Sequence, residues 1–184
     1  LKKETNYDAV WGFDFNYYSK LLAYCAKHNI KIIGLNVPNQ ITHMIATTGY
    51  NELDDRLKEI LPIIDFNDKA HKEQFVKTMS THMNIIENKD KLERYYQSEC
   101  LWDEYMADSL AIYKSQHPSH KVLAIVGSGH VRYRRGIPNR VAKRTLINPY
   151  VVIGEQVEFD ASSGLPEISR LPAHDEADLI WYTA

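Results

Sequence analysis

The sequence predicts an α/β fold, in which a layered and mostly parallel sheet is flanked by helices. Two short, continuous apolar runs, at 30–37 and 121–126, have the pattern of strands that are buried on both faces. Segments with helical spacing of apolar residues lie between and around these runs. Chains that alternate buried strands with helices form α/β layers. The strands nearest the C-terminus are the ones we expect to run antiparallel, if any do.

Helical periodicity and end signals define the remaining elements. Asn39 is a candidate N-cap, Gly49 a stop signal, and Pro138 suits the first turn of a short helix that ends near Lys143. The break at 117–119 ends the longest helix. Helices are therefore predicted at 16–28, 39–47, 68–83, 92–115 and from 138, and further strands at 145–153, 157–159 and 178–182.

Length and charge limit the class of protein. The chain has 184 residues, with 22 Lys and Arg against 24 Asp and Glu, which gives a net charge of −2. This predicts one domain over 1–184, with the irregular stretch 51–93 as an insertion or lobe. A near-neutral charge argues against binding to nucleic acid. No apolar run approaches the length of a transmembrane helix, and two distant cysteines exclude a disulfide scaffold.

The stretch 127–140, directly after the second apolar run, is the strongest candidate for a functional site. It begins with the sequence Gly-Ser-Gly-His, which places His130 beside a tight turn. Ligands of open α/β sheets bind at the carboxyl ends of strands, and 36–43 occupies the equivalent place after the first run. Arginines in such a place bind carboxylates or phosphates. The stretch carries four of them, with one tyrosine among them: Arg132, Tyr133, Arg134, Arg135 and Arg140.

Several familiar motifs do not fit this stretch. A dinucleotide-binding loop would have glycine where Arg132 stands, and a phosphate-binding P-loop would have Gly-Lys-Ser/Thr. A nucleophile elbow around Ser128 would have glycine in place of Val126. The motif His-Glu-x-x-His does not occur in the chain.

Other polar residues have both functional and structural interpretations. Asp103 and Glu104 form either a carboxylate pair or a pair that faces water or caps a loop, and the second interpretation is the commoner one. A lone histidine on a helix, such as His43, is more often structural than functional. The same holds for His71 and His82, which share a helical stripe, and for the pair at 117 and 120 across a proline break.

Three motifs in order resemble the ChaN-like haem-binding family, which belongs with the Tiki, TraB and erythromycin-esterase-like proteins. The first is Val-Leu-Ala-Ile-Val-Gly-Ser-Gly-His-Val at 122–131, followed by Gly-Ile-Pro at 136–138 and Arg140. The second is Trp-Asp-Glu-x-Met-Ala at 102–107. The third is the helix at 17–26 with Ile-Gly-Leu-Asn-Val-Pro at 33–38. The resemblance covers 11–50 and 95–145.

The chain also departs from the family pattern. Family members usually begin with a strand that bears a Gly-Glu-x-His-type motif and continue with a Glu-Met-Phe segment, and neither is present. About a third of the usual domain, with the first strands of the sheet, is therefore expected to precede Leu1 in a complete family member.

The resemblance implies a protein that binds haem without a defined reaction, for uptake or trafficking of haem or iron, and that forms a dimer. The family uses tyrosine as an iron ligand, and a phenolate suits ferric haem. Tyr133 and His130 are the expected iron ligands. The remaining expected haem-binding residues are Tyr18, Arg132, Arg134, Arg140, Asn36 and His43.

Two other functions remain open at this point. One is a non-catalytic, accessory subunit of a larger assembly that keeps the ChaN-like fold. The other is a metal-dependent hydrolase of the wider superfamily, in which His130 and an acidic residue would activate water. The expected partners are haem and a second copy or a larger complex, with peripheral association to a membrane as a further expectation. The expected location is a plastid or a bacterial envelope.

Overall fold

The computed structural model describes residues 2–5, 7–82, 88–159, 162–164, 166–167 and 175–183. The chain divides into two compact units, Leu1–Leu35 and Asn36–Ala184, and each is described by itself. The expectation of one domain over 1–184, with a lobe at 51–93, stays a prediction.

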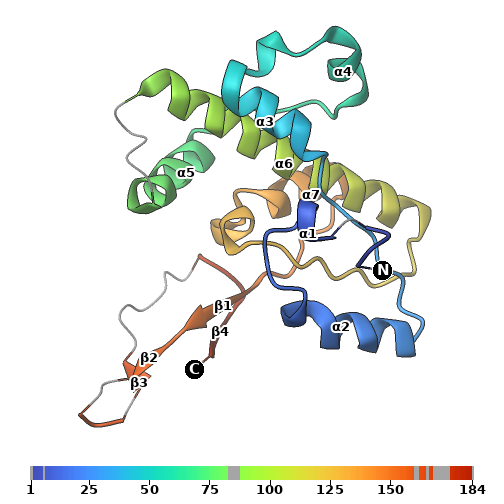
Figure 1. Ribbon diagram of the computed structural model, residues 1–184, viewed down its shortest axis with the longest axis vertical. Helices are drawn as coiled ribbons and strands as arrows, with labels where there is room; N and C mark the ends of the chain where they lie inside the picture. Colours follow the sequence, from blue (N-terminus) through green and yellow to red (C-terminus); the bar gives the residue numbers. More distant parts are fainter. Residues whose placement is uncertain are drawn as a thin grey trace. The chain divides into compact units, whose positions relative to one another are not determined.

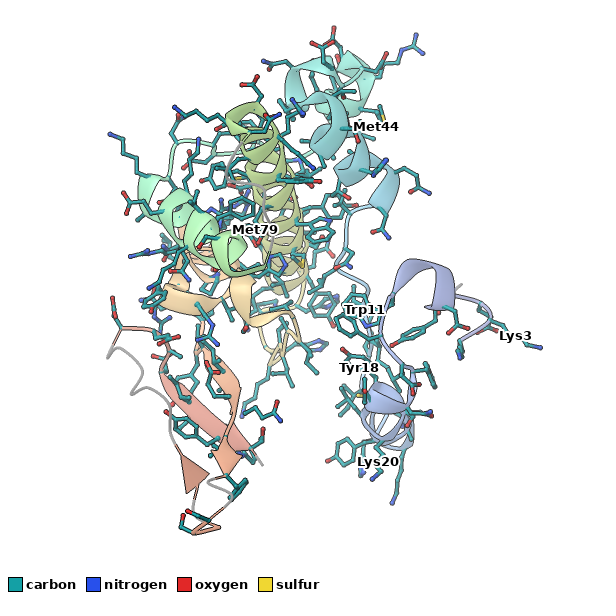
Figure 2. All side chains as sticks on the ribbon, turned by 60° about the vertical axis from the view of Figure 1, so that its left-hand side comes forward. Lys3, Trp11, Tyr18, Lys20, Met44 and Met79 are labelled. Atoms are coloured by element: carbon teal, nitrogen blue, oxygen red, sulfur yellow. The ribbon has the colours of Figure 1, made fainter. Side chains whose placement is uncertain are left out.

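The first unit contains two helices, α1 (Tyr7–Val10) and α2 (Asn16–Lys27). No residue of α2 is buried, and Tyr17 is 77% exposed. An edge-to-face contact between Trp11 and Tyr18, with ring centroids 6.1 Å apart, holds the start of α2 against the preceding turn (Figure 2). The predicted helix at 16–28 is confirmed within one residue.

The second unit is organised around one long helix, α6 (Lys89–Gln116). Three other helices pack on it, namely α3 (Asn39–Thr48), α5 (Lys69–His82) and α7 (Ile137–Thr145) (Figure 1). Shorter helical turns complete the unit: η1 (Tyr50–Glu52), α4 (Asp55–Ile60), η2 (Ser128–His130) and η3 (Arg132–Arg134).

Local signals explain where these helices begin and end. The side chain of Asn88 accepts the backbone N–H of Lys91 at 3.0 Å and caps α6. Gly49 ends α3 at φ 100°, a conformation that glycine adopts without strain. The expected N-cap Asn39 is wrong by one position, because Pro38 precedes the first helical turn and Asn39 lies within it. The predicted end of α5 at residue 83 lies outside the described residues.

Two apolar clusters hold the helices of the second unit together. Between α3 and α6 lie Val37, Ile45, Leu53, Leu61 and Leu101. Between α5 and α6 lie Phe75, Tyr96 and Cys100, with Met79 packed against them (Figure 2). Burial of a Leu or Phe side chain contributes roughly 1.5–3 kcal/mol, so α6 is held on two sides.

Strands occur near the C-terminus and make the fold α/β. β1 (Val152–Gln156) pairs in parallel with β4 (Leu179–Thr183), with Val152 opposite Leu179. β2 (Glu158–Phe159) pairs antiparallel with β3 (Pro166–Glu167). The predicted strands in this region are thus confirmed, with small shifts of their ends.

The two runs expected to form the central strands do not do so. Residues 30–37 and 121–126 are extended, but neither is paired as a strand with any described residue. Both runs carry exposed apolar side chains, among them Ile32 at 51% and Leu123 at 82%. An apolar run predicts a strand only when a neighbouring strand supplies its hydrogen bonds, and the described residues supply none.

Within the described residues, no helix has both the length and the apolar character needed to span a membrane.

Candidate functional site

A group of charged residues lies where α5, α6, α7 and the 127–136 loop meet. α6 presents Glu99 and Asp103, which are four residues apart and therefore share one helix face. α5 supplies His71, the loop supplies His130, and α7 supplies Arg140. We call these five residues the acid–histidine cluster.

Asp103 is the centre of the acid–histidine cluster and is fully buried. Its Oδ1 lies 2.8 Å from Nδ1 of His130, and its Oδ2 lies 3.1 Å from Nε2 of His71. Arg140 Nη1 stands 3.7 Å from the same Oδ2. Burial alone would raise the pKa of Asp103, but the contacts from His130 and His71 outweigh it and hold that pKa below its usual value. Asp103 is therefore a carboxylate that bridges two imidazoles.

His130 faces a second carboxylate as well. Its Nδ1 lies 3.2 Å from Oε1 of Glu99, and its side chain is only 16% exposed. Burial disfavours the imidazolium, but the hydrogen bond to Asp103 and the charge of Glu99 raise the pKa of His130 to about 9. Burial raises the pKa of Glu99. Since Nδ1 is engaged by carboxylates, Nε2 is the ring nitrogen left for a ligand, and no described residue is hydrogen-bonded to it.

Arg140 links the cluster to a second buried carboxylate. Its Nε donates to Oε1 of Glu104 at 2.9 Å, and its Nη1 donates to the carbonyl of Arg135 at 2.9 Å. Arg144 Nη2 donates to the other oxygen of Glu104 at 2.6 Å. Burial would lower the pKa of Arg140, but Asp103 and Glu104 raise it above its usual value. Each buried charge here thus has a partner of opposite sign, as burial requires.

The loop reaches the cluster by a close approach at Gly136. A Cβ at this position would lie 2.8 Å from the carbonyl carbon of His130 and 3.0 Å from Oδ2 of Asp103. Only a residue without a side chain fits between the loop and α6. Two neighbouring residues, Tyr133 at φ 53° and Arg134 at φ 59°, adopt the left-handed conformation that is uncommon outside glycine.

His71 is held on its other side by polar groups of α6. Its Nδ1 lies 3.4 Å from the hydroxyl of Tyr96 and 4.0 Å from Sγ of Cys100. Burial raises the pKa of the Tyr96 hydroxyl, and it raises the pKa of the Cys100 thiol to about 12. Both groups therefore stay protonated, so the thiol is not a reactive nucleophile. The Tyr96 hydroxyl also donates to the carbonyl of Asp68 at 3.1 Å.

Three residues of the cluster present donors that suit a metal ion. One ligand atom each from Glu99, Asp103 and His130 lies within 4.8 Å of the other two. One imidazole and two carboxylates bind divalent ions such as Zn²⁺ or Mn²⁺. His71 behind Asp103 matches the hydrogen-bonded support that such ligands have in metal sites.

The arginines expected to bind anions are paired with carboxylates of the chain itself. Arg132 forms ion pairs with Glu155 and Glu176. Arg134 pairs with Asp178 and donates to the carbonyl of Pro149 at 2.6 Å. Their positions join the 127–136 loop to β1 and β4, and the third expected arginine, Arg140, lies within the acid–histidine cluster as described above.

The other predicted ligand-binding residues are spread over both units. Tyr133 is half-buried, its backbone N–H donates to the carbonyl of Glu176 at 2.9 Å, and its ring lies 5.2 Å from the guanidinium of Arg135. Tyr18 belongs to the first unit. Asn36 and His43 are exposed, and no hydrogen bond among the described residues joins them to the loop.

The structure corrects the interpretation of Asp103 and Glu104 as residues that face water. Their side chains are 0% and 4% exposed, and both are paired with positive groups. Sequence reasoning missed Glu99, although its spacing of four from Asp103 places it on the same helix face. It treated His71 as structural, and nothing local in the sequence shows that this residue meets Asp103, 32 positions away.

Comparison with known proteins places the chain in a family. The family described as "Haem-binding uptake, Tiki superfamily, ChaN" matches residues 1–141, which include α6 and the whole 127–140 loop. The match spans more than half of the chain, so the chain belongs to this family. No curated protein and no solved structure matches it.

Proposed function

We propose that this member of the haem-binding uptake family carries haem for uptake or trafficking, without a reaction of its own, and binds it beside the 127–140 loop. The observation that supports this is the orientation of His130. Carboxylates engage its Nδ1, which leaves Nε2 as the nitrogen that would meet the haem iron.

The residues present fit such a ligand. Imidazole is an established axial ligand of haem iron, and a metal-binding histidine usually donates its other N–H to a carboxylate. Asp103 is already placed for that role, and its Oδ2 accepts no well-aligned hydrogen bond. When bound, the haem iron supplies an open coordination position. The chain's own residues orient the imidazole and keep its tautomer fixed.

The arginines divide into two groups with respect to the haem propionates. Arg132 and Arg134 are 17% and 33% exposed, and their pairs with Glu155 and Asp178 lie near solvent. A propionate can exchange with such surface carboxylates at small cost, because exposed ion pairs contribute only about 0–1 kcal/mol. Arg140 is 4% exposed and bonded to Glu104, so we assign it to supporting Asp103.

Haemin titration of the chain tests the proposal, with the visible spectrum as readout. We expect saturable binding near one haem per chain. His130→Ala should remove the ligand-specific spectrum, whereas His117→Ala, at the far end of α6, should not. Tyr133→Phe tests the other candidate ligand, and we expect a weaker effect on the spectrum. Unspecific haemin binding that is equal in wild type and His130→Ala would refute the proposal.

A second candidate function, a metal-dependent hydrolase, is favoured by the convergence of Glu99, Asp103 and His130 within 4.8 Å. A divalent ion there would activate water, as metal ions do in hydrolytic enzymes. Titration of the haem-free chain with Mn²⁺, followed by electron paramagnetic resonance, tests it. Stoichiometric binding that is lost in Glu99→Gln would favour this function. Free Mn²⁺ throughout the titration would exclude it.

A non-catalytic role within a larger assembly or a dimer is the third candidate, favoured by exposed apolar side chains in 121–126, such as Leu123. Measurement of molar mass in solution tests it, because Leu123→Lys should lower the mass of an assembly that uses this run. The expected location in a plastid or bacterial envelope, and a peripheral association with membrane, stay predictions.

A further inference from the structure

We propose that the carboxylates behind His130 make this chain selective for ferric over ferrous haem. The inference rests on the proposed haem function and names the oxidation state of its ligand. It depends on the charges that surround the imidazole.

Two negative groups and one positive group face His130. Asp103 Oδ1 stands at 2.8 Å and Glu99 Oε1 at 3.2 Å from its Nδ1. Arg140 is the cation nearest to this group, at 3.7 Å from Asp103, and its Nε is bonded to Glu104 instead. His71 contacts Asp103 through Nε2. Negative charge therefore outweighs positive charge on the Nδ1 side of His130.

This charge distribution acts through the imidazole on a bound iron. A carboxylate that accepts the Nδ1 hydrogen bond increases the basicity of the ligating nitrogen. Ferric haem carries one more positive charge than ferrous haem, and in a buried site that charge interacts strongly with nearby carboxylates. Since Asp103 is fully buried and Glu99 is 20% exposed, solvent screens this attraction only in part.

His71 acts as a positioning residue in this arrangement. Its Nε2 contacts Oδ2 of Asp103, while its Nδ1 lies 3.4 Å from Nη2 of Arg140. A guanidinium only donates hydrogen bonds, so Nδ1 accepts and Nε2 carries the hydrogen that faces Asp103. His71 thereby holds the carboxylate in the rotamer that meets His130.

The experiment compares redox-inert analogues of the two ligands. Ga³⁺ protoporphyrin represents ferric haem, Zn²⁺ protoporphyrin represents ferrous haem, and metal-free protoporphyrin reports contacts to the ring alone. We expect the wild-type chain to bind the Ga³⁺ form at least about tenfold more tightly than the Zn²⁺ form, the scale on which supporting residues change metal affinity.

Two variants and two matched controls assign the preference to the carboxylates. Asp103→Asn and Glu99→Gln should each reduce the ratio of Ga³⁺ to Zn²⁺ affinity. Asp108→Asn and Glu93→Gln, which remove carboxylates of the same helix that pair with Arg144 and Lys72, should leave the ratio unchanged. If Asp103→Asn does not fold, as judged by circular dichroism, Glu99→Gln still decides the question.

His71→Gln gives a separate readout of positioning. In histidine labelled with ¹⁵N, the haem-free wild type should show His130 with its hydrogen held on Nδ1, and His71→Gln should change that signal. An unchanged His130 signal in folded His71→Gln would refute the role of His71.

The outcomes separate the two proposals. Binding of all three porphyrins with equal affinity would refute selectivity for ferric haem and leave the haem function standing. No binding of any porphyrin would refute the haem function itself. A preference for Ga³⁺ that persists in both carboxylate variants would refute the assignment to Asp103 and Glu99.

Discussion

Replacing Gly136 with alanine would place a methyl group in space that the backbone of His130 already occupies. The φ angle of Gly136 is −87°, which any residue can adopt, so the cost of this change comes from crowding alone. The added Cβ would lie 2.8 Å from the carbonyl carbon of His130 and 3.0 Å from Oδ2 of Asp103. Neither atom is the free end of a flexible side chain, so the loop must move away from α6.

Overpacking of this kind usually costs about 1–3 kcal/mol, and a clash with backbone belongs at the upper end of that range. For a chain of this size, a loss of about 3 kcal/mol lowers the melting temperature by roughly 6–12 °C. The displacement of the loop should also move His130 away from Asp103 and weaken haemin binding.

Thermal unfolding and haemin titration of Gly136→Ala measure both effects, with Gly129→Ala as the matched control. A Cβ at Gly129 meets no atom within 4 Å, so this control should behave like wild type or gain slightly in stability. Wild-type stability and haemin affinity in Gly136→Ala would refute the described packing of the loop against α6.

Three further changes test other parts of the structure. Arg140→Met should lower the free energy of unfolding by about 3 kcal/mol in urea, because it leaves buried carboxylates without a cation; a loss below about 1 kcal/mol would contradict the buried pair. Leu146→Gly should raise the melting temperature by a few degrees, since Leu146 ends α7 at φ 59° and is 93% exposed, and this conformation costs a residue other than glycine about 1 kcal/mol; a lower melting temperature would count against it. The backbone N–H of Val151 and then Arg134 hold the pKa of Asp178 below its usual value of 3.8, so its stabilising contribution is complete above pH 3.8 and is lost as pH falls through the lower, folded value; protection of the Val151 amide from hydrogen exchange should therefore persist at pH 4 and fall only in stronger acid, and loss already at pH 5 would refute the pairing.

The helices could be predicted from the sequence because their signals are local. The period of apolar residues, the cap at Asn88 and the stop at Gly49 all lie within a few positions of the element that they define. The error at Asn39 is one position, since Pro38 occupies the cap and the asparagine side chain caps nothing there.

The central strands were not predictable in the same way. The runs at 30–37 and 121–126 have the composition of buried strands, yet their pairing depends on residues far away in the chain. The β1–β4 pair shows the opposite case, because each strand has a partner 27 positions away, as in the pairing of Val152 with Leu179.

The candidate site was predictable in part. The Gly-x-Gly-His pattern drew attention to His130, and the arginine-rich loop was correctly placed beside it in sequence. The burial of Asp103 could not be read from its neighbours, because the groups that stabilise its charge come from α5, α7 and the loop. A buried carboxylate needs such partners, and only the tertiary structure supplies them.

The central claim is that Nε2 of His130 binds haem iron while Asp103 holds Nδ1. Pulsed electron paramagnetic resonance of the ferric haem complex, prepared with ¹⁵N-labelled histidine, tests it most directly. The account predicts a strongly coupled ¹⁵N signal from one histidine, which is absent in His130→Ala and retained in His117→Ala. A stoichiometric haem complex without such a signal, or with one that survives His130→Ala, would contradict it.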